Sequence, residues 1–221
     1  MTALEIEKLN DRFAPLSPKE RMEELYKLFS PGDVLVTSSF GTTSALLLHH
    51  VHETCPDQPI YFIDTRFLFP ETLQYKDLLS ARLELRVHSL RADESGYRYA
   101  ADNELWKTEA DVCCGINKTM PVEEVRSNYK VWVAGLMAYQ NNFRDNLNVF
   151  EMKGGTLRFY PLIDMGEGEV EAYFKVHDLP KHPLVARGYG SVGCVQCTVK
   201  GKGRAGRWMG QFKTECGLHR G

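Results

Sequence analysis

The sequence predicts an α/β fold with a mainly parallel, doubly wound sheet, and three observations support this prediction. Short apolar runs at 34–36, 60–63 and 131–133 have the length and composition of buried strands. Helical patterns separate these runs, and polar loops follow the first two of them. Because the carboxyl ends of parallel strands meet at one edge of a sheet, we expect a ligand site in the loops after residues 36 and 63.

The composition is that of one packed domain with a local binding site. The chain has 221 residues, of which 43% are hydrophobic and 25% charged, and this balance excludes wholesale disorder. The 27 basic and 29 acidic side chains give a formal charge of -2, which argues against a surface devoted to nucleic acid or membrane. No apolar run is long enough to span a bilayer, and the acidic N-terminus is unlike a secretory signal. We therefore expect a cytoplasmic protein.

The first predicted helix begins at Pro18, where Ser17 and Glu20 form a capping box. It ends before Pro31, and hydrophobic periodicity and turn residues delimit the later elements. We expect, in chain order, a strand at 34–36, a loop at 37–44, a helix at 45–52, a strand at 60–63, a helix at 70–83, a strand at 84–89, a mainly helical stretch at 91–126, a strand at 131–133, a hairpin of strands at 147–150 and 156–160, and a helix at 168–177.

The loop from Ser38 to Ser44 is the first candidate site. Its small and hydroxylated residues leave backbone N–H groups and the positive end of the next helix facing outward, which suits a phosphate group. It lacks the Walker pattern, so a nucleoside triphosphate with magnesium is not indicated. An ordinary loop whose hydroxyl groups cap a helix explains the same residues equally well.

Four of the six cysteines form two close pairs, Cys113-Cys114 and Cys194-x-x-Cys197. Together they offer four soft ligands, enough for a zinc ion or an iron–sulfur cluster. Adjacent cysteines cannot form the separated chelate loops that zinc usually takes, which favours iron–sulfur. The alternative is that the first pair is buried in the core and the second is a thioredoxin-like redox pair.

Cys216 stands apart from the other cysteines. Lys213, His219 and neighbouring cations would favour its thiolate, which is the form that attacks an electrophile. The sequence therefore indicates a nucleophile near the end of the chain, with an incidental terminal cysteine as the alternative.

Several groups of residues carry a family resemblance: Ser39-Phe40-Gly41, Asp64-Thr65 with Leu68 to Thr72, Cys113-Cys114-Gly115-Ile116 with Lys118, Trp132-Val133 with Gly135-Leu136, Gly193-Cys194 with Cys197-Thr198, Arg204 to Trp208, and Lys213 to His219. On these residues the chain resembles the assimilatory adenylyl-sulfate (APS) and phosphoadenylyl-sulfate (PAPS) reductases over nearly its whole length. The resemblance implies a sheet of the adenine-nucleotide alpha-hydrolase type, which is similar to that of PP-loop proteins.

The resemblance also implies an activity. Cys216 would attack the sulfonyl sulfur of APS, expel AMP and keep an S-sulfonate, from which thioredoxin or glutaredoxin would release sulfite on the assimilatory route to cysteine. The paired cysteines resemble the subgroup that carries a [4Fe-4S] cluster and usually prefers APS, whereas members without them use PAPS. A PAPS reductase with the same mechanism is the main alternative.

The implied site has three parts. Cys216 is the catalytic residue, and Cys113, Cys114, Cys194 and Cys197 would hold the cluster. The implied substrate-binding residues are Ser38, Ser39, Phe40, Gly41, Ser44, Asp64, Thr65, Lys118, Arg204, Arg207 and His219. We expect a single-domain protein made of an N-terminal helical segment at 1–30, a nucleotide-binding α/β part at 31–193, and a flexible segment at 194–221 with cluster-binding cysteines and the catalytic one.

The chain departs from the family pattern at three places. Asn117 and Met137-Ala138 stand where arginines are usual, so two anion contacts are missing, and Arg66 follows Asp64-Thr65 where a glycine is usual. Arg66 is therefore a candidate replacement cation.

Two rival functions come from other classes of protein. An ATP-dependent PP-loop sulfur-transfer enzyme normally shows Ser-Gly-Gly-x-Asp-Ser, whereas the stretch from Ser39 to Ser44 lacks the second glycine and the aspartate. A zinc-organised RNA-binding module is disfavoured by the near-neutral charge. We expect a sulfonucleotide and a thiol reductant as partners, without nucleic acid or membrane, and leave homo-oligomerisation open.

Overall fold

The computed structural model describes residues 1–210, 213 and 215–220, and it contains a six-stranded sheet in the order β3-β2-β1-β4-β6-β5. The strands are β1 (Val34–Ser38), β2 (Ile60–Ile63), β3 (Val87–Leu90), β4 (Val131–Val133), β5 (Phe150–Lys153) and β6 (Thr156–Phe159). All neighbouring pairs are parallel except β5 and β6, which form an antiparallel hairpin. The predicted α/β class with a mainly parallel sheet is confirmed.

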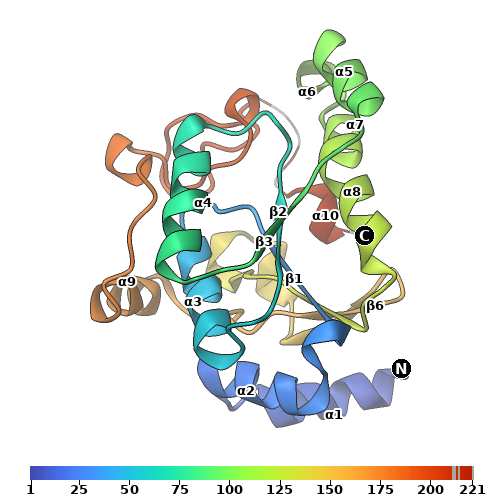
Figure 1. Cartoon of the computed structure of the whole chain (residues 1–221), viewed down its shortest axis with the longest axis vertical. Helices are drawn as coiled ribbons and strands as arrows, with labels where there is room; N and C mark the ends of the chain where they lie inside the picture. Colours follow the sequence, from blue (N-terminus) through green and yellow to red (C-terminus); the bar gives the residue numbers. More distant parts are fainter. Residues whose placement is uncertain (211–212, 214, 221) are drawn as a thin grey trace.

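Helices cover both faces of this sheet. They are α1 (Ala3–Phe13), α2 (Pro18–Leu28), α3 (Ser44–Thr54), α4 (Pro70–Arg82), α5 (Glu94–Asp102), α6 (Leu105–Thr108), α7 (Ala110–Cys114), α8 (Met120–Arg126), α9 (Glu167–Val176) and α10 (Gly217–Arg220). A π-helical turn at Gly115–Thr119 joins α7 to α8, and short 3₁₀ turns lie at Pro31–Asp33, Ala138–Gln140, Arg144–Asn146, Val185–Arg187 and Val195–Cys197. Figure 1 shows α3 and α4 on one side of the strands and α7, α8 and α10 on the other.

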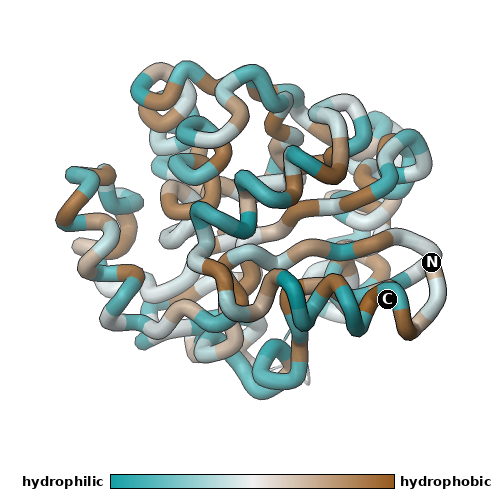
Figure 2. The backbone as a smooth tube through the Cα atoms, turned by 90° about the horizontal axis from the view of Figure 1, so that it is seen from below, coloured by the Kyte–Doolittle hydropathy of each residue, from teal (hydrophilic) through white to brown (hydrophobic). Residues whose placement is uncertain are grey.

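The alternation of side chains along each strand produces two cores. Val34, Val36, Val131 and Val133 face the first core, and Leu35 and Trp132 face the second. The first core, which includes Met22, Leu46 and Phe174, is packed between the sheet and α2, α3 and α9. The second core consists of Leu35, Ile63, Leu90, Cys114, Val122, Trp132, Trp208, Cys216 and Leu218. Figure 2 shows hydrophobic segments crossing the interior, while the outer helices alternate between hydrophilic and hydrophobic residues.

The predicted helix starts and strands largely agree with the structure. At the start of α2 the Glu20 N–H donates to Ser17 Oγ at 3.4 Å and the Glu20 carboxylate accepts from the Ser17 N–H at 2.8 Å, which confirms the capping box. A second capping box, at Thr2 and Glu5, begins α1, a helix whose own boundaries the sequence analysis did not place.

Two strand boundaries differ from the prediction, each because of a turn. The third strand begins at Val87 rather than Glu84, because Glu84 has φ 49 and ends the preceding helix in a left-handed conformation. The first hairpin strand is 150–153 rather than 147–150. Gly154 and Gly155 have φ 54 and 73, so they form a two-residue turn, and the paired strand must extend to Lys153.

The described part of the segment after residue 193 packs against the second core. Isolated bridges join Leu68 to Cys194 and Thr198 to Arg207, and Trp208 is only 2% exposed. Among the described residues, no helix has the length and apolarity needed to cross a membrane. The domain boundaries at 30 and 193 stay predictions.

Candidate active site

A cavity of about 840 Å³ lies at the carboxyl ends of the parallel strands, where the sequence placed the ligand site. Ser38 and Ser39 line it at the end of β1, and Gly135 lines it just after β4. The segment after residue 187 closes the opposite wall, so residues far apart in the sequence share one space.

The loop after β1 presents its hydroxyl groups to this cavity. Ser38, Ser39, Gly41 and Ser44 all line it, as predicted. Phe40 does not. Its side chain is fully buried in the first core, with its ring centroid 5.4 Å from that of Phe62. A left-handed backbone at Phe40, with φ 49, turns this side chain inward and leaves the serines on the cavity.

The loop after β2 contributes less than the sequence indicated. Thr65 lines the cavity, but Asp64 is buried outside it, and its carboxylate accepts from Arg91 Nε at 2.8 Å and from the Arg66 N–H at 2.9 Å. The Arg66 side chain turns away, pairs with Glu94 and lies 4.7 Å above the ring of Tyr97. Arg66 therefore lies apart from the cavity that a replacement cation would be expected to line.

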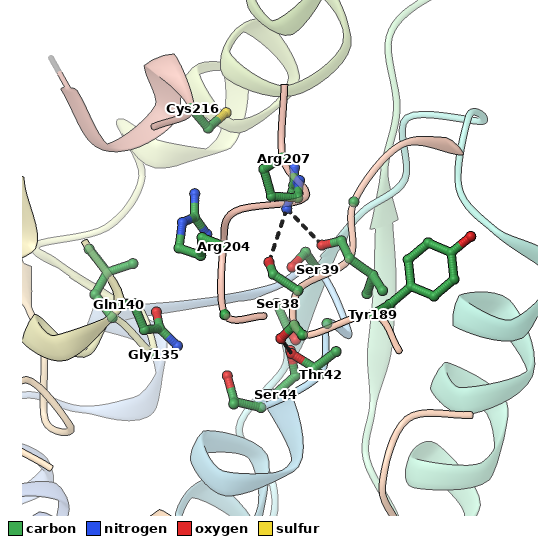
Figure 3. A pocket seen from close by; sticks show the side chains of 18 of the residues that line it. Ser38, Ser39, Thr42, Ser44, Gly135, Gln140, Tyr189, Arg204, Arg207 and Cys216 are labelled. Carbon is green, nitrogen blue, oxygen red and sulfur yellow. Dashed lines mark hydrogen bonds between the residues drawn. The ribbon is translucent and has the colours of Figure 1, made fainter. Parts of the chain in front are cut away.

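Lys118, Arg204, Arg207 and His219 all line the cavity. Figure 3 shows Arg204 and Arg207 between the serines of the β1 loop and Cys216. Arg207 Nη1 donates to the Val192 carbonyl at 2.8 Å. Its guanidinium lies so close to Gly193 that a Cβ atom there would overlap with it, so a larger residue at that position would have to displace the Arg207 side chain.

The electrostatics differ among these groups. Burial lowers the pKa of Lys118, but the negative charge of Cys194, Cys216 and Cys114 in their thiolate forms outweighs that effect and raises the pKa above its usual value. Burial, together with nearby Arg144, lowers the pKa of His219 to about 3. Lys118 is therefore charged at neutral pH, whereas the imidazole of His219 is neutral.

Arg144 is a cavity residue that the sequence analysis missed. It comes from the 3₁₀ turn Arg144–Asn146, is 5% exposed, and its Nε donates to Glu215 at 2.7 Å. Met137, at a usual arginine position, is fully buried in the first core, where an arginine would be expensive to bury. The only available signal was an arginine in a polar, turn-rich stretch after β4.

The four paired cysteines gather around a second, smaller cavity next to the first. Cys113, Cys114, Cys194 and Cys197 line it together with Phe67, Trp106, Asn117 and Lys118. The Asn117 amide donates to the Cys113 carbonyl at 3.1 Å, so this side chain faces the cysteines and does not line the larger cavity. All six cysteines are free thiols.

These thiols are close enough to influence one another. Burial and then the neighbouring thiols raise the pKa of Cys113 to about 12 and that of Cys197 to about 11. In the described ranges, no three His, Cys, Asp or Glu side chains are arranged as a metal site. The donor set of four cysteines around one cavity nevertheless fits a group with sulfur ligands.

Cys216 lies on the wall of the large cavity, is 8% exposed and belongs to the second core. A hydrogen bond with Cys114 and burial raise its pKa, while Lys118 acts in the opposite direction. Lys213, expected to favour the thiolate, donates instead to Asp111 at 2.5 Å and to the Ala110 carbonyl at 3.2 Å. With His219 neutral, Lys118 is a cation that favours the thiolate, and the charge of Arg204 also interacts with Cys216.

Comparisons with known proteins agree on one family. The profile of the phosphoadenosine phosphosulfate reductase domain matches residues 33–200. The adenosine 5'-phosphosulfate reductase of Chelativorans sp. is 36% identical over 98% of this chain and 91% of that protein. The phosphoadenosine 5'-phosphosulfate reductase of Photobacterium profundum is 35% identical over 98% and 88%.

Solved structures resemble the fold. The phosphoadenylyl-sulfate reductase of Candida auris has a TM-score of 0.76 at 24% identity, covering 90% of this chain and 98% of that one. An FMN adenylyltransferase of Candida glabrata reaches 0.60 at 16% identity, covering 88% and 66%. These likenesses support the predicted sheet type.

Proposed function

The chain belongs to the phosphoadenosine phosphosulfate reductase family, and we propose that its own substrate is APS, which it reduces to sulfite and AMP through an S-sulfonate on Cys216. It is an enzyme of sulfonucleotide reduction, like the relatives that match nearly its whole length. The observation that carries the proposal is the position of Cys216 in the same cavity as Lys118, Arg204 and Arg207.

The first step is attack by the Cys216 thiolate on the sulfonyl sulfur of APS. A sulfur–sulfur bond forms, the bond from sulfur to the bridging oxygen of the phosphate breaks, and AMP leaves with the electron pair. Lys118 lies near Cys216 and stabilises both the thiolate and the anionic substrate. Arg204 and Arg207 offset the charge that develops on the leaving phosphate, which is electrostatic preorganisation.

The second step needs a dithiol protein, and we propose thioredoxin or glutaredoxin. One thiol attacks Cys216 Sγ and releases sulfite, which carries away the electron pair of the sulfur–sulfur bond. The second thiol resolves the mixed disulfide, so the reductant ends as a disulfide and Cys216 returns to the thiol. The six free thiols suit a reducing compartment, which supports a cytoplasmic enzyme.

We propose that Cys113, Cys114, Cys194 and Cys197 hold a [4Fe-4S] cluster. The support is that four thiols from two distant stretches line one small cavity. Phe67 and Trp106 form apolar walls that exclude water, and Thr65 Oγ1 lies 3.2 Å from Cys194 Sγ, where it orients that thiol. A bound cluster would supply fixed charge beside Lys118 and so polarise the substrate site.

The preference for APS rests on the paired cysteines and on relatives that carry that name. The test is sulfite release by anaerobically purified protein with thioredoxin, comparing APS and PAPS side by side. Faster turnover of APS is expected. Faster turnover of PAPS would agree with the proposed mechanism but show that PAPS is the preferred substrate. Absence of sulfite with both substrates would reject the proposed function.

Two variants separate the cysteine roles. Cys216→Ser is expected to lose sulfite formation and keep its iron, and turnover by this variant would reject the nucleophile. Cys197→Ser is expected to lower the iron and acid-labile sulfide per chain. Unchanged iron content in that variant, or a wild-type protein without iron, would reject the cluster.

A further inference from the structure

Glu215 is a buried carboxylate placed among the cations of the active site. It directly precedes the nucleophile Cys216, lines the large cavity and is only 1% exposed. A buried carboxylate requires compensating partners, and a carboxylate in a site for anionic substrates repels what the site has to bind. Its presence there therefore needs a reason.

The partners of Glu215 join three separate parts of the chain. Its Oε2 accepts from Arg144 Nε at 2.7 Å and from Asn141 Nδ2 at 3.1 Å. Its Oε1 accepts from Arg204 Nη2 at 3.0 Å and from the backbone N–H of Cys216 at 2.9 Å. One side chain thus connects the loop after β4, the basic segment and the backbone of the nucleophile.

The charges around Glu215 show what this arrangement does to the site. Burial opposes ionisation, but Arg144 and Arg204 outweigh it and lower the pKa of Glu215 to about 2, so the group is a carboxylate at neutral pH. It offsets part of the positive charge of these two arginines and fixes the direction of their guanidinium groups. Figure 3 shows Arg204 on the side of the cavity that faces Cys216.

We propose that Glu215 is a positioning residue. Through Arg144 and Arg204 it fixes the backbone of Cys216 beside the anion site, and it limits how tightly that site holds the anionic substrate and AMP. The inference rests on the proposed role of Cys216 as the nucleophile. Glu215 would act on the reaction through its partners, because its carboxylate accepts from Arg144, Arg204 and the backbone N–H of Cys216.

This role predicts opposite effects on binding and on rate in Glu215→Gln. The variant keeps the shape of the side chain and loses its charge. The positive charge of both arginines is then no longer offset by a carboxylate, and AMP is expected to bind roughly threefold to tenfold more tightly. Cys216 loses a hydrogen bond to a charged acceptor, and formation of the S-sulfonate is expected to slow by on the order of tenfold to a hundredfold. A purely structural role would weaken binding and slow the reaction together.

The experiment measures the two quantities separately. Calorimetry gives the dissociation constant of AMP, and rapid mixing of APS with full-length enzyme, without reductant, gives the rate of S-sulfonate formation by mass spectrometry. Glu7→Gln, at an exposed position on α1, is the matched control for the change in charge and is expected to behave as the wild type. Arg144→Gln combined with Glu215→Gln is expected to return AMP affinity towards the wild-type value while the rate stays slow.

The outcomes distinguish this inference from the proposed function. Absence of S-sulfonate on the wild type would overturn both. An S-sulfonate on the wild type, with Glu215→Gln reacting equally fast or binding AMP less tightly, would overturn the inference alone. If Glu215→Gln does not fold, Glu215→Asp keeps the charge and withdraws the carboxylate by one methylene. It is expected to keep AMP affinity and slow the reaction, and wild-type kinetics in that variant would also overturn the inference.

Discussion

The two faces of the sheet differ in what they bury. The first core is an apolar cluster between the strands and the helices α2, α3 and α9. The second core is smaller and contains two thiols, Cys114 and Cys216. Arg158 lies against its Trp132, with the guanidinium 3.7 Å from the ring centroid. We infer that the first face supplies most of the free energy of folding. The second face buries less apolar surface, because a nucleophile and its cations lie there next to the cavity.

Physical reasons support this division. An apolar core is stabilised in proportion to the area it removes from water, without the cost of burying charge. The second face must keep Lys118 and Arg204 charged close to the thiols, so each buried group there depends on a specific partner. Mutations on the first face should therefore lower the stability of the fold and leave the catalytic rate unchanged. Mutations on the second face should lower the catalytic rate and leave the stability nearly unchanged.

The largest expected effect comes from the second face. Lys118→Ala removes a cation that favours the Cys216 thiolate, and sulfite formation is expected to fall by about a hundredfold to a thousandfold. The melting temperature should change little, because the first core is untouched. Steady-state assays and calorimetry measure the two quantities. Lys107→Ala, at an exposed site on α6, is the control, and a loss below about threefold in Lys118→Ala would contradict the assignment.

A matching substitution in the first core should show the opposite profile. Leu46 on α3 is fully buried, so Leu46→Ala is expected to lower the free energy of unfolding by about 3 kcal/mol. Its KM for APS should stay within about twofold of the wild type at a temperature where the variant is folded. Denaturant titration and steady-state kinetics provide the test. A large loss of turnover in the folded variant would show that the two faces are not separable in this way.

The buried imidazole of His182, on the side of the first core, should make the stability of the fold depend on pH. Burial lowers the pKa of His182 to about 4. Its Nδ1 accepts from the Leu184 N–H at 3.2 Å and its Nε2 lies 3.1 Å from Thr72 Oγ1, so the ring is bound as the neutral form. The stabilisation is full above the unfolded pKa of about 6.5 and is lost as the pH falls towards 4.

The expected size of this loss is about 2 to 3 kcal/mol between pH 7 and pH 4. Urea titrations across that range should show a shallower pH dependence in His182→Gln than in the wild type. Equal slopes in the two proteins would mean that His182 does not titrate as its buried position implies.

The fold and most of the site could be predicted because they depend on local patterns. The alternation of apolar runs with helices located four of the six strands closely, and the loop after β1 was placed on the cavity, where Ser38 and Ser44 indeed lie. Parallel topology fixes the edge at which such loops meet, so the sequence alone brings them together. The prediction that Lys118 and Arg207 lie near this loop did not come from local patterns. It came from the family resemblance.

The remainder depended on side-chain direction, which sequence spacing does not determine. Phe40 belongs to the motif of the loop, but a left-handed backbone turns its ring into the first core. Arg144 could not be recognised because the 3₁₀ turn that directs it into the cavity has no distinctive pattern. Asn117 and Met137 looked like lost anion contacts, yet one faces the cysteines and the other the first core.

The smallest expected effect tests the same point at Arg66. The sequence offered Arg66 as a substitute cation, but its side chain pairs with Glu94 on the surface and does not line the cavity. Arg66→Ala should therefore leave the KM for APS within about twofold, while Arg207→Ala should raise it by about tenfold or more. Both variants remove one guanidinium, so the contrast isolates position from charge. If the KM rises as much in Arg66→Ala as in Arg207→Ala, Arg66 contacts the substrate, and it would then be the replacement cation that the sequence suggested.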